Sequence, residues 1–152
     1  MKLLKQAADR LQLTNIKQVV TDAFRYGPVA PAYDRVLADV PCSGWGVFGR
    51  KADLRWQANK NIDELVKLQE KALDYAANFV RPGGILVYST CTLNPAENEE
   101  QIKKFLKRNP KFTLVNAKEI LPSDFVVEGM FKTLPFKHDM DGAFAAKMRK
   151  SR

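Results

Sequence analysis

RVLADVPCSG, residues 35–44, joins an apolar run to a proline, a cysteine and two small residues. Pro41 has no backbone N–H for a sheet ladder, so a strand is expected to end there. Ser43 and Gly44 then allow a tight turn. Cys42 is therefore predicted at the carboxyl end of a strand, the position at which open α/β sheets bind their ligands.

A second stretch, ILVYSTCTLNPAENEE (85–100), follows the same pattern. ILVYST is typical of a strand buried on both faces, and Cys91 follows it directly. The two thiols could serve chemistry or packing, because cysteine is among the most buried residue types. A disulfide between Cys42 and Cys91 is the less favoured alternative, since two cysteines in a chain without a signal peptide suit a reducing compartment.

Along the rest of the chain, strand patterns and helix patterns alternate. Asn61 opens a long amphipathic helix that should stop near Pro82, and Asn94 with Pro95 forms a helix start. Helices are expected over 2–12, 61–79 and from 94 onward, and strands over 17–21, 35–40, 85–90, 112–117 and 143–149. This alternation predicts a single α/β domain over 1–152 with a mostly parallel sheet.

The composition limits the class of function. Lys plus Arg number 25 against 17 acids, which gives a net charge of +8 and a pI near 9.6. Such a charge favours nucleic-acid binding, although a merely basic, soluble surface is the plain alternative. There is no apolar run long enough for a membrane span, no signal-peptide region and no metal-ligand spacing. A cytoplasmic protein without a metal is expected.

Three blocks, DRVLADVPCSGWGVFGRKADLRW, RPGGILVYSTCTLNPAENEEQI and HDMDGAFAAKMRK, carry a resemblance. Their content and order are similar to the Sun (Fmu) family of RNA cytosine-5 methyltransferases, from about Leu3 to Lys150. Pro41-Cys42 and Thr90-Cys91 match the family's two cysteine motifs. The resemblance implies a partial Rossmann-like fold that uses S-adenosylmethionine.

The resemblance also implies roles for the two thiols. Carbon 5 of cytosine is a poor nucleophile, and a thiolate that adds to carbon 6 activates it toward the cofactor's methyl group. Cys91 takes the role of that nucleophile, and Cys42 assists product release through loss of the carbon-5 proton. A basic, polar pocket at the strand ends is expected to favour ionised thiols.

Further site residues follow from the same resemblance. Asp22 matches the position that faces the adenine, and Asp39 with Pro41 matches the motif near the methyl donor; capping of loops is the alternative for both acids. RNA phosphates would be contacted by Arg50, Lys51 and Arg55, with Trp45 and Trp56 available for stacking, unless this is an ordinary solvated loop. His138 is expected to be structural or solvated.

The family's glycine-rich cofactor loop and its ribose-binding acid are not found in the 152 residues. The first two strands of the methyltransferase sheet are therefore expected to be absent, and strand edges to be exposed. We expect weak or no S-adenosylmethionine binding by the chain alone, and self-association or a partner chain that supplies the missing strands. A truncated frame, a fragment of a longer enzyme and half of a split enzyme all fit.

Two other functions stay open. In a DNA cytosine-5 methyltransferase the Pro-Cys thiol would be the nucleophile, but the Thr-Cys motif would be unexplained. A non-catalytic, basic RNA-binding module would explain the missing cofactor loop but not the two cysteine motifs. For the RNA methyltransferase, small-subunit ribosomal RNA is the first expected substrate and transfer RNA the second.

Overall fold

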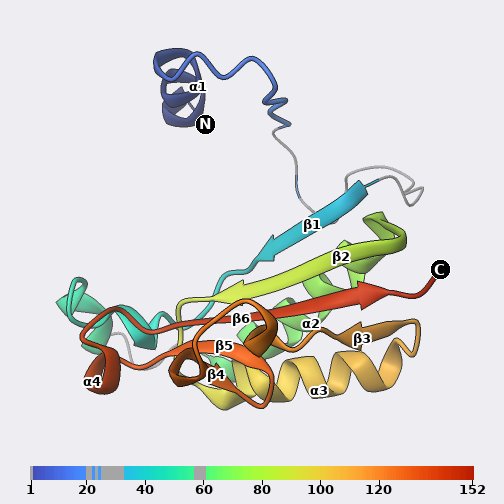
Figure 1. Ribbon diagram of the computed structural model, residues 1–152. Helices are drawn as coiled ribbons and strands as arrows, with labels where there is room; N and C mark the ends of the chain where they lie inside the picture. The colour runs from blue at the N-terminus through green and yellow to red at the C-terminus, as the bar shows by residue number, and fades with distance from the viewer. Residues whose placement is uncertain (1, 20–21, 23, 25–32, 57–60) are drawn as a thin grey trace.

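The computed structural model describes residues 2–19, 22, 24, 33–56 and 61–152. Figure 1 shows helices packed on a twisted sheet, with the N-terminal helix apart from it. The helices are α1 (Lys2–Arg10), α2 (Ile62–Phe79), α3 (Glu99–Arg108) and α4 (Pro135–His138). The strands are β1 (Tyr33–Asp39), β2 (Val80–Thr90), β3 (Phe112–Leu114), β4 (Val126–Val127), β5 (Met130–Thr133) and β6 (Ala143–Lys150).

The sheet is mixed, so the α/β class is confirmed but the expectation of a mostly parallel sheet is wrong. Its order is β1-β2-β6-β5-β4, and β3 also pairs with β6. Among the described strands only β1 and β2 pair in parallel. β6 runs antiparallel between β2 on one edge and β3 with β5 on the other. The alternation of Phe144, Ala146 and Met148 had fixed which residues of β6 point inward, but such a pattern carries no information on direction.

The α2 helix shows how the local sequence sets an element. The Asn61 side chain accepts a hydrogen bond from the Glu64 N–H, and acids occupy the first turn. The helix ends at Phe79, as predicted, and β2 follows without an intervening turn. β2 therefore starts at Val80, five residues before the predicted start. Val80 is buried, and the exposed residues that follow it include Pro82 and the positive-φ Gly83, which masked this part of the strand in the sequence.

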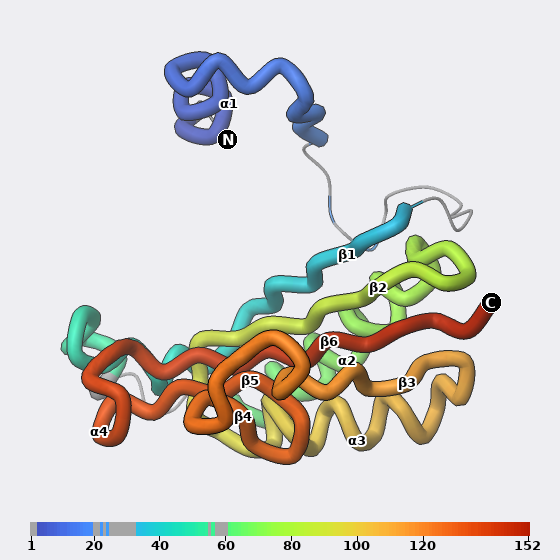
Figure 2. Tube along the Cα trace, viewed as in Figure 1, coloured from blue at the N-terminus to red at the C-terminus, as the bar shows by residue number. Residues whose placement is uncertain are grey.

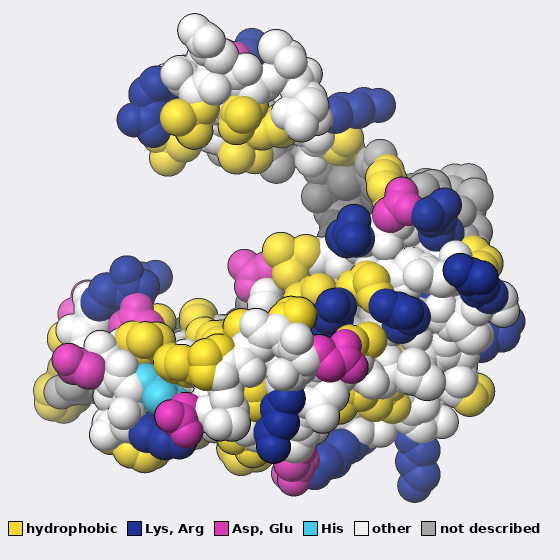
Figure 3. Space-filling view, in the orientation of Figure 1, with side chains coloured by type: hydrophobic (Ala, Val, Ile, Leu, Met, Phe, Trp, Pro, Cys, Tyr) yellow, Lys and Arg dark blue, Asp and Glu magenta, His cyan; other side chains and the backbone are white. Residues whose placement is uncertain are grey.

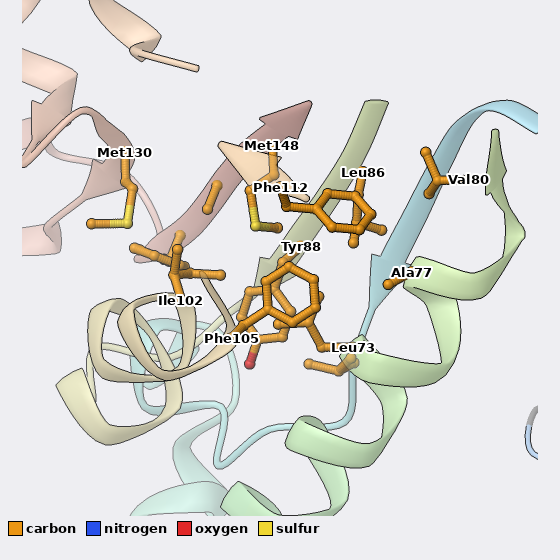
Figure 4. Close-up of a cluster of buried hydrophobic side chains, with 13 residues drawn as sticks. Leu73, Ala77, Val80, Leu86, Tyr88, Ile102, Phe105, Phe112, Met130 and Met148 are labelled. Carbon is orange, nitrogen blue, oxygen red and sulfur yellow. The ribbon is translucent and has the colours of Figure 1, made fainter. Parts of the chain in front are cut away.

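The hydrophobic core lies between the sheet and the two helices α2 and α3 (Figure 4). Leu73 from α2, Phe105 from α3 and Tyr88 from β2 are fully buried there. The Tyr88 hydroxyl donates to the Glu97 carbonyl oxygen at 2.7 Å, which satisfies the one polar group that this ring brings inside. This packing fixes α2 and α3 against the strands whose ends carry the cysteines.

Several predicted elements differ from the structure at their ends. The predicted strand 17–21 is not formed over its described residues 17–19, because no described strand offers its backbone a partner; residues 20–21 lie outside the description. The strand 112–117 is shorter, at Phe112–Leu114. The helix predicted from Asn94 begins as a 3-10 turn, Pro95–Glu97, and continues as α3 after Asn98.

Beyond the core, β1 lies at one end of the sheet, and its outer edge has no partner strand among the described residues. Leu37 on this strand is 66% exposed. Figure 2 shows α1 apart from β1 and from the rest of the sheet. Leu3 and Leu4 give α1 an apolar face, and both side chains are exposed. Exposure of a strand edge agrees with the expectation from the sequence.

None of the described helices is long and apolar enough to cross a membrane.

Removal of the α2 cap offers a test of this local account. Asn61→Ala is expected to lower the free energy of unfolding by about 1 kcal/mol, because the Glu64 N–H loses its acceptor. Urea denaturation followed by circular dichroism measures the change. Asn78→Ala is the control, since Asn78 bonds only the carbonyl of Asp74 within the helix. An equal loss in both variants would contradict the capping role.

Candidate active site

The two cysteine-bearing loops meet at one edge of the sheet. β1 and β2 run in parallel with Asp39 beside Ser89, so both strands end at the same edge of the sheet (Figure 1). The Sγ atoms of Cys42 and Cys91 lie 3.3 Å apart, and the Cys91 N–H points at the Cys42 sulfur at 3.4 Å. Both cysteines are free, so the disulfide alternative is not realised in this structure. The structure thus pairs two thiols that are 49 residues apart.

The two thiols differ in exposure. Cys91 is exposed and Cys42 is half-buried. Burial, together with the hydrogen bond to Cys91 and the charge of Cys91, raises the pKa of the Cys42 thiol to about 11, against backbone N–H groups that lower it. The expectation that the pocket favours ionised thiols is therefore wrong for Cys42, because desolvation outweighs the backbone N–H groups that favour the thiolate. Cys42 can instead donate its S–H to the Cys91 sulfur.

The raised pKa predicts slow alkylation of Cys42. A pKa near 11 in place of 9.0 leaves about a hundredfold less thiolate at pH 8, since each unit is a factor of ten. With substoichiometric iodoacetamide, the initial rate at Cys42 should rise about tenfold per pH unit up to pH 10 or beyond. The same chain in urea is the control, and its rate should level off above pH 9. Peptide mass spectrometry measures both, and a folded-state plateau at pH 9 would contradict the raised pKa.

Asp39 is the last residue of β1, and Pro41 follows it two residues later. The Asp39 carboxylate accepts from the Ser89 hydroxyl at 2.8 Å and remains exposed. Both residues line a cavity of about 550 Å³ that runs along β1 and α2. This volume is within the range of small-molecule sites, about 300–1,000 Å³. The remaining lining is largely apolar: Val19, Phe24, Val36, Leu37, Ala38, Val40, Leu68, Ala72, Tyr75, Ala76 and Phe79.

Asp22 lies in the segment that borders the same cavity. Its carboxylate accepts a hydrogen bond from the Phe24 N–H at 3.0 Å, which is the local capping that was the alternative for this acid. Its neighbours Val19 and Phe24 line the cavity, but Asp22 does not. The structure therefore brings the segment to the cavity without bringing this carboxylate into its wall.

The loop that follows Cys42 carries the predicted RNA contacts. Arg50 is 76% exposed but forms an ion pair with Asp141, a residue that the sequence did not suggest as a partner. Lys51 is exposed, Trp45 is half-buried, and Trp56 is 90% exposed. Arg55 ends a 3-10 turn, Ala52–Arg55, and its side chain lies outside the described residues. Figure 3 shows Lys and Arg side chains distributed over the visible face and not gathered in one patch.

His138 has the structural role expected of it. Its Nδ1 accepts from the Leu134 N–H at 2.8 Å, its Nε2 is 3.1 Å from the Asp124 carbonyl oxygen, and its ring stacks on Phe125. The imidazole is thus committed to holding α4 and the turn before β4. Among the described residues, no group of three or more His, Cys, Asp or Glu side chains is placed to hold a metal ion.

Close backbone contacts lock the two loops to the start of β6. The Gly46 N–H donates to the Cys91 carbonyl at 3.0 Å, and the Gly142 N–H donates to the Gly46 carbonyl at 2.8 Å. A Cβ added to Gly46 would lie 2.8 Å from that Cys91 oxygen, far inside ordinary contact distance. Three segments distant in sequence can meet here because two of them present glycine.

A buried acid that the sequence reasoning missed lies beneath the cysteines. Glu97 follows the predicted helix start at Asn94 and Pro95 and was not among the predicted site residues, but its side chain is fully buried. Its carboxylate accepts hydrogen bonds from both cysteine-bearing loops and from Gln69 of α2. A spacing of four residues from Glu97 to Gln101 and Phe105, all three fully buried, is the signal that could have revealed it.

Comparison with known proteins gives this site a family. A family model described as 16S rRNA methyltransferase RsmB/F matches residues 1–149. The chain belongs to the RsmB/F methyltransferase family. The resemblance inferred from the Pro-Cys and Thr-Cys motifs is thereby confirmed at the level of the family.

Two curated relatives are both named as probable ribosomal RNA small subunit methyltransferase B. The probable ribosomal RNA small subunit methyltransferase B of Synechocystis is 43% identical over 148 residues, which are 93% of this chain and 33% of that protein. Its counterpart in Bacillus subtilis is 40% identical over 98% of this chain and 35% of its own length. The chain thus spans about a third of the RsmB/F relatives it matches.

Solved structures agree on the fold. PH0851 superposes with a TM-score of 0.88 at 36% identity, over 99% of this chain and 34% of its own. NSun6 from Pyrococcus horikoshii, solved with SFG, an analogue of S-adenosylmethionine, gives a TM-score of 0.84 at 29% identity, over 99% of this chain and 38% of its own. The RsmB/F chain described here is therefore a partial Rossmann-like methyltransferase fold.

Proposed function

We propose that this chain is the cysteine-bearing part of an RNA cytosine-5 methyltransferase that transfers a methyl group from S-adenosylmethionine to cytosine in ribosomal RNA. The observation that carries the proposal is the 3.3 Å separation of the Cys42 and Cys91 sulfurs at the carboxyl ends of two parallel strands. A thiol can add to carbon 6 of a cytosine ring and so activate carbon 5. Transfer RNA is the second candidate substrate.

The two thiols take different roles in this proposal. Cys91 is the nucleophile, because it is exposed and can reach a base above the sheet edge. Cys42 lies beside it, half-buried and protonated at neutral pH. As the bond between the Cys91 sulfur and carbon 6 breaks, the Cys42 S–H would pass its proton to the departing Cys91 sulfur, and the Cys42 sulfur would take up the carbon-5 proton, so that both thiols are restored. The S–H of Cys42 is also positioned to donate to the Cys91 sulfur before the base arrives.

The residues present fit part of the cofactor. The exposed Asp39 carboxylate at the end of the cavity could hold a cationic group, and Pro41 with the apolar lining suits the adenine ring. S-adenosylmethionine supplies an electrophilic methyl group when bound. Asp22 would face the adenine from the segment that borders the cavity.

RNA binding is proposed for the loop after Cys42. Exposed Arg50 and Lys51, with Arg55 nearby in sequence, would contact phosphates, and the exposed Trp56 offers a ring on which a base could stack. Arg50 would exchange its ion pair with Asp141 for a phosphate. A ribosomal RNA substrate would place the protein in the cytoplasm.

Methyl transfer to defined nucleic acids tests the proposal. The chain is incubated with methyl-labelled S-adenosylmethionine and small-subunit ribosomal RNA, transfer RNA or DNA, and nucleosides are analysed by mass spectrometry. Labelled 5-methylcytidine from RNA supports the proposal, and labelled 5-methyl-2′-deoxycytidine from DNA would favour the DNA enzyme. RNA binding without label, in a chain that also binds S-adenosylmethionine, would favour the non-catalytic module.

Calorimetric titration with S-adenosylmethionine, with the solution mass measured alongside, accompanies this test. Saturable micromolar binding supports competence of the chain or of its assembly. No binding would place the activity in an assembly with further chain.

A further inference from the structure

The Glu97 carboxylate is buried beneath both cysteine loops. Its Oε1 accepts from the Ser43 N–H at 2.9 Å and from Gln69 Nε2 at 2.8 Å. Its Oε2 accepts from the Ser43 hydroxyl at 2.5 Å and from the Thr92 hydroxyl at 3.2 Å. All four donors are neutral, and the side chain has no solvent exposure. A buried carboxylate is costly, and this one is retained with its acceptor positions filled.

The donors stand next to the thiols in the chain. Ser43 directly follows Cys42, and Thr92 directly follows Cys91. The hydroxyls of Ser43 and Thr92 also lie 2.6 Å apart, so that the residues after the two cysteines are in contact as well. Glu97 therefore forms hydrogen bonds with both loops, in each case at the residue that follows the cysteine.

Gln69 connects this hydrogen-bond network to α2. Its Nε2 donates both to Glu97 and to the Pro41 carbonyl at 2.9 Å, so it holds the residue that precedes Cys42. Tyr88 fixes the Glu97 backbone from below, and burial raises the pKa of its phenol, which keeps it a donor. The loop around Cys42 is thus held on both sides of the cysteine.

We propose that Glu97 is a positioning residue that sets the separation of the Cys42 and Cys91 sulfurs through Ser43 and Thr92. It touches neither thiol, so it takes no part in bond making. A glutamine at this position has no charge and only one acceptor oxygen. If that oxygen keeps the Ser43 N–H and Gln69, the NH₂ group faces the hydroxyls of Ser43 and Thr92, which must rotate to accept, and the charge-assisted hydrogen bonds of the carboxylate are lost. The geometric claim is independent of the proposed function; only its consequence for methyl transfer rests on it.

A trivalent arsenical reads the separation directly. Phenylarsine oxide condenses with two neighbouring thiols, forming two As–S bonds and releasing one water, with no oxidation or reduction. The full chain is titrated with phenylarsine oxide, bridging is measured by intact mass, and a competing dithiol gives the affinity. Cys42→Ala, which retains one thiol, calibrates the loss of bridging.

Glu97→Gln is expected to weaken arsenical bridging about tenfold while the chain remains folded, which is about 1.4 kcal/mol of affinity. Glu100→Gln is the matched control, an exposed acid three residues on, and should bridge like the native chain. Ser43→Ala removes one donor but keeps the backbone N–H, and should weaken bridging in the same direction.

Native-like bridging in folded Glu97→Gln would overturn the proposal, and if that variant does not fold, Ser43→Ala decides by the same criterion. Neither RNA nor cofactor enters the measurement. A native chain that bridges arsenic and binds S-adenosylmethionine but methylates no RNA would contradict the proposed function and leave the positioning role supported.

Discussion

Cys91→Ala is expected to form no covalent complex with RNA that contains 5-azacytidine, whereas Cys42→Ala is expected to form one. The nitrogen at position 5 of this base has no proton to lose after methyl transfer, so the enzyme–RNA bond stays closed. Only the attacking thiol is needed to reach that state, and the exposed Cys91 is the sulfur that a base can approach. Denaturing gel electrophoresis with labelled RNA and S-adenosylmethionine detects the complex.

The same variants separate the competing mechanisms. If Cys42 serves release, Cys42→Ala should also accumulate a complex on unmodified RNA, since elimination fails while attack proceeds. A complex that is lost in Cys42→Ala and kept in Cys91→Ala would assign the attack to the Pro-Cys thiol, as in a DNA-type enzyme. The double variant controls for non-covalent retention.

The cysteine pair could be predicted from the sequence because strand ends are visible in it. Pro41 stops one strand, Thr90 ends a run of apolar residues, and parallel strands leave a sheet at the same edge. What the sequence did not reveal is how deep each thiol would lie. The burial that raises the pKa of Cys42 comes from segments packed around it, so charge counting alone gave the wrong expectation for that thiol.

The direction of β6 and the role of Glu97 were missed for a related reason. Residues 143–149 show which side chains face the core but not which neighbours the strand will choose. Glu97 resembles any acid at the start of a helix, and only its long-range donors Ser43 and Gln69 distinguish it. Local patterns determine elements, whereas partners 28 and 54 residues away determine this site.

Gly46→Ala is expected to lower the free energy of unfolding by about 3 kcal/mol, the upper range for overpacking of a tight contact. For a chain of this size that corresponds to a fall in Tm of about 10 °C. The new methyl would meet the Gly142 carbonyl group, with its carbon at 2.7 Å, as well as the Cys91 oxygen at 2.8 Å. Backbone atoms cannot rotate away as a flexible side chain can, so whole segments must move.

Gly49→Ala is the control for Gly46→Ala, because a Cβ there meets nothing within 4 Å. It lies in the same loop and should change the free energy of unfolding by less than about 0.5 kcal/mol. Thermal and urea denaturation compare the two variants. Since the Gly46 N–H holds the Cys91 carbonyl, displacement of this loop should also weaken arsenical bridging of the two thiols. Equal stability of the two alanine variants would show that the loops yield without cost, and that glycine is not what keeps these three segments together.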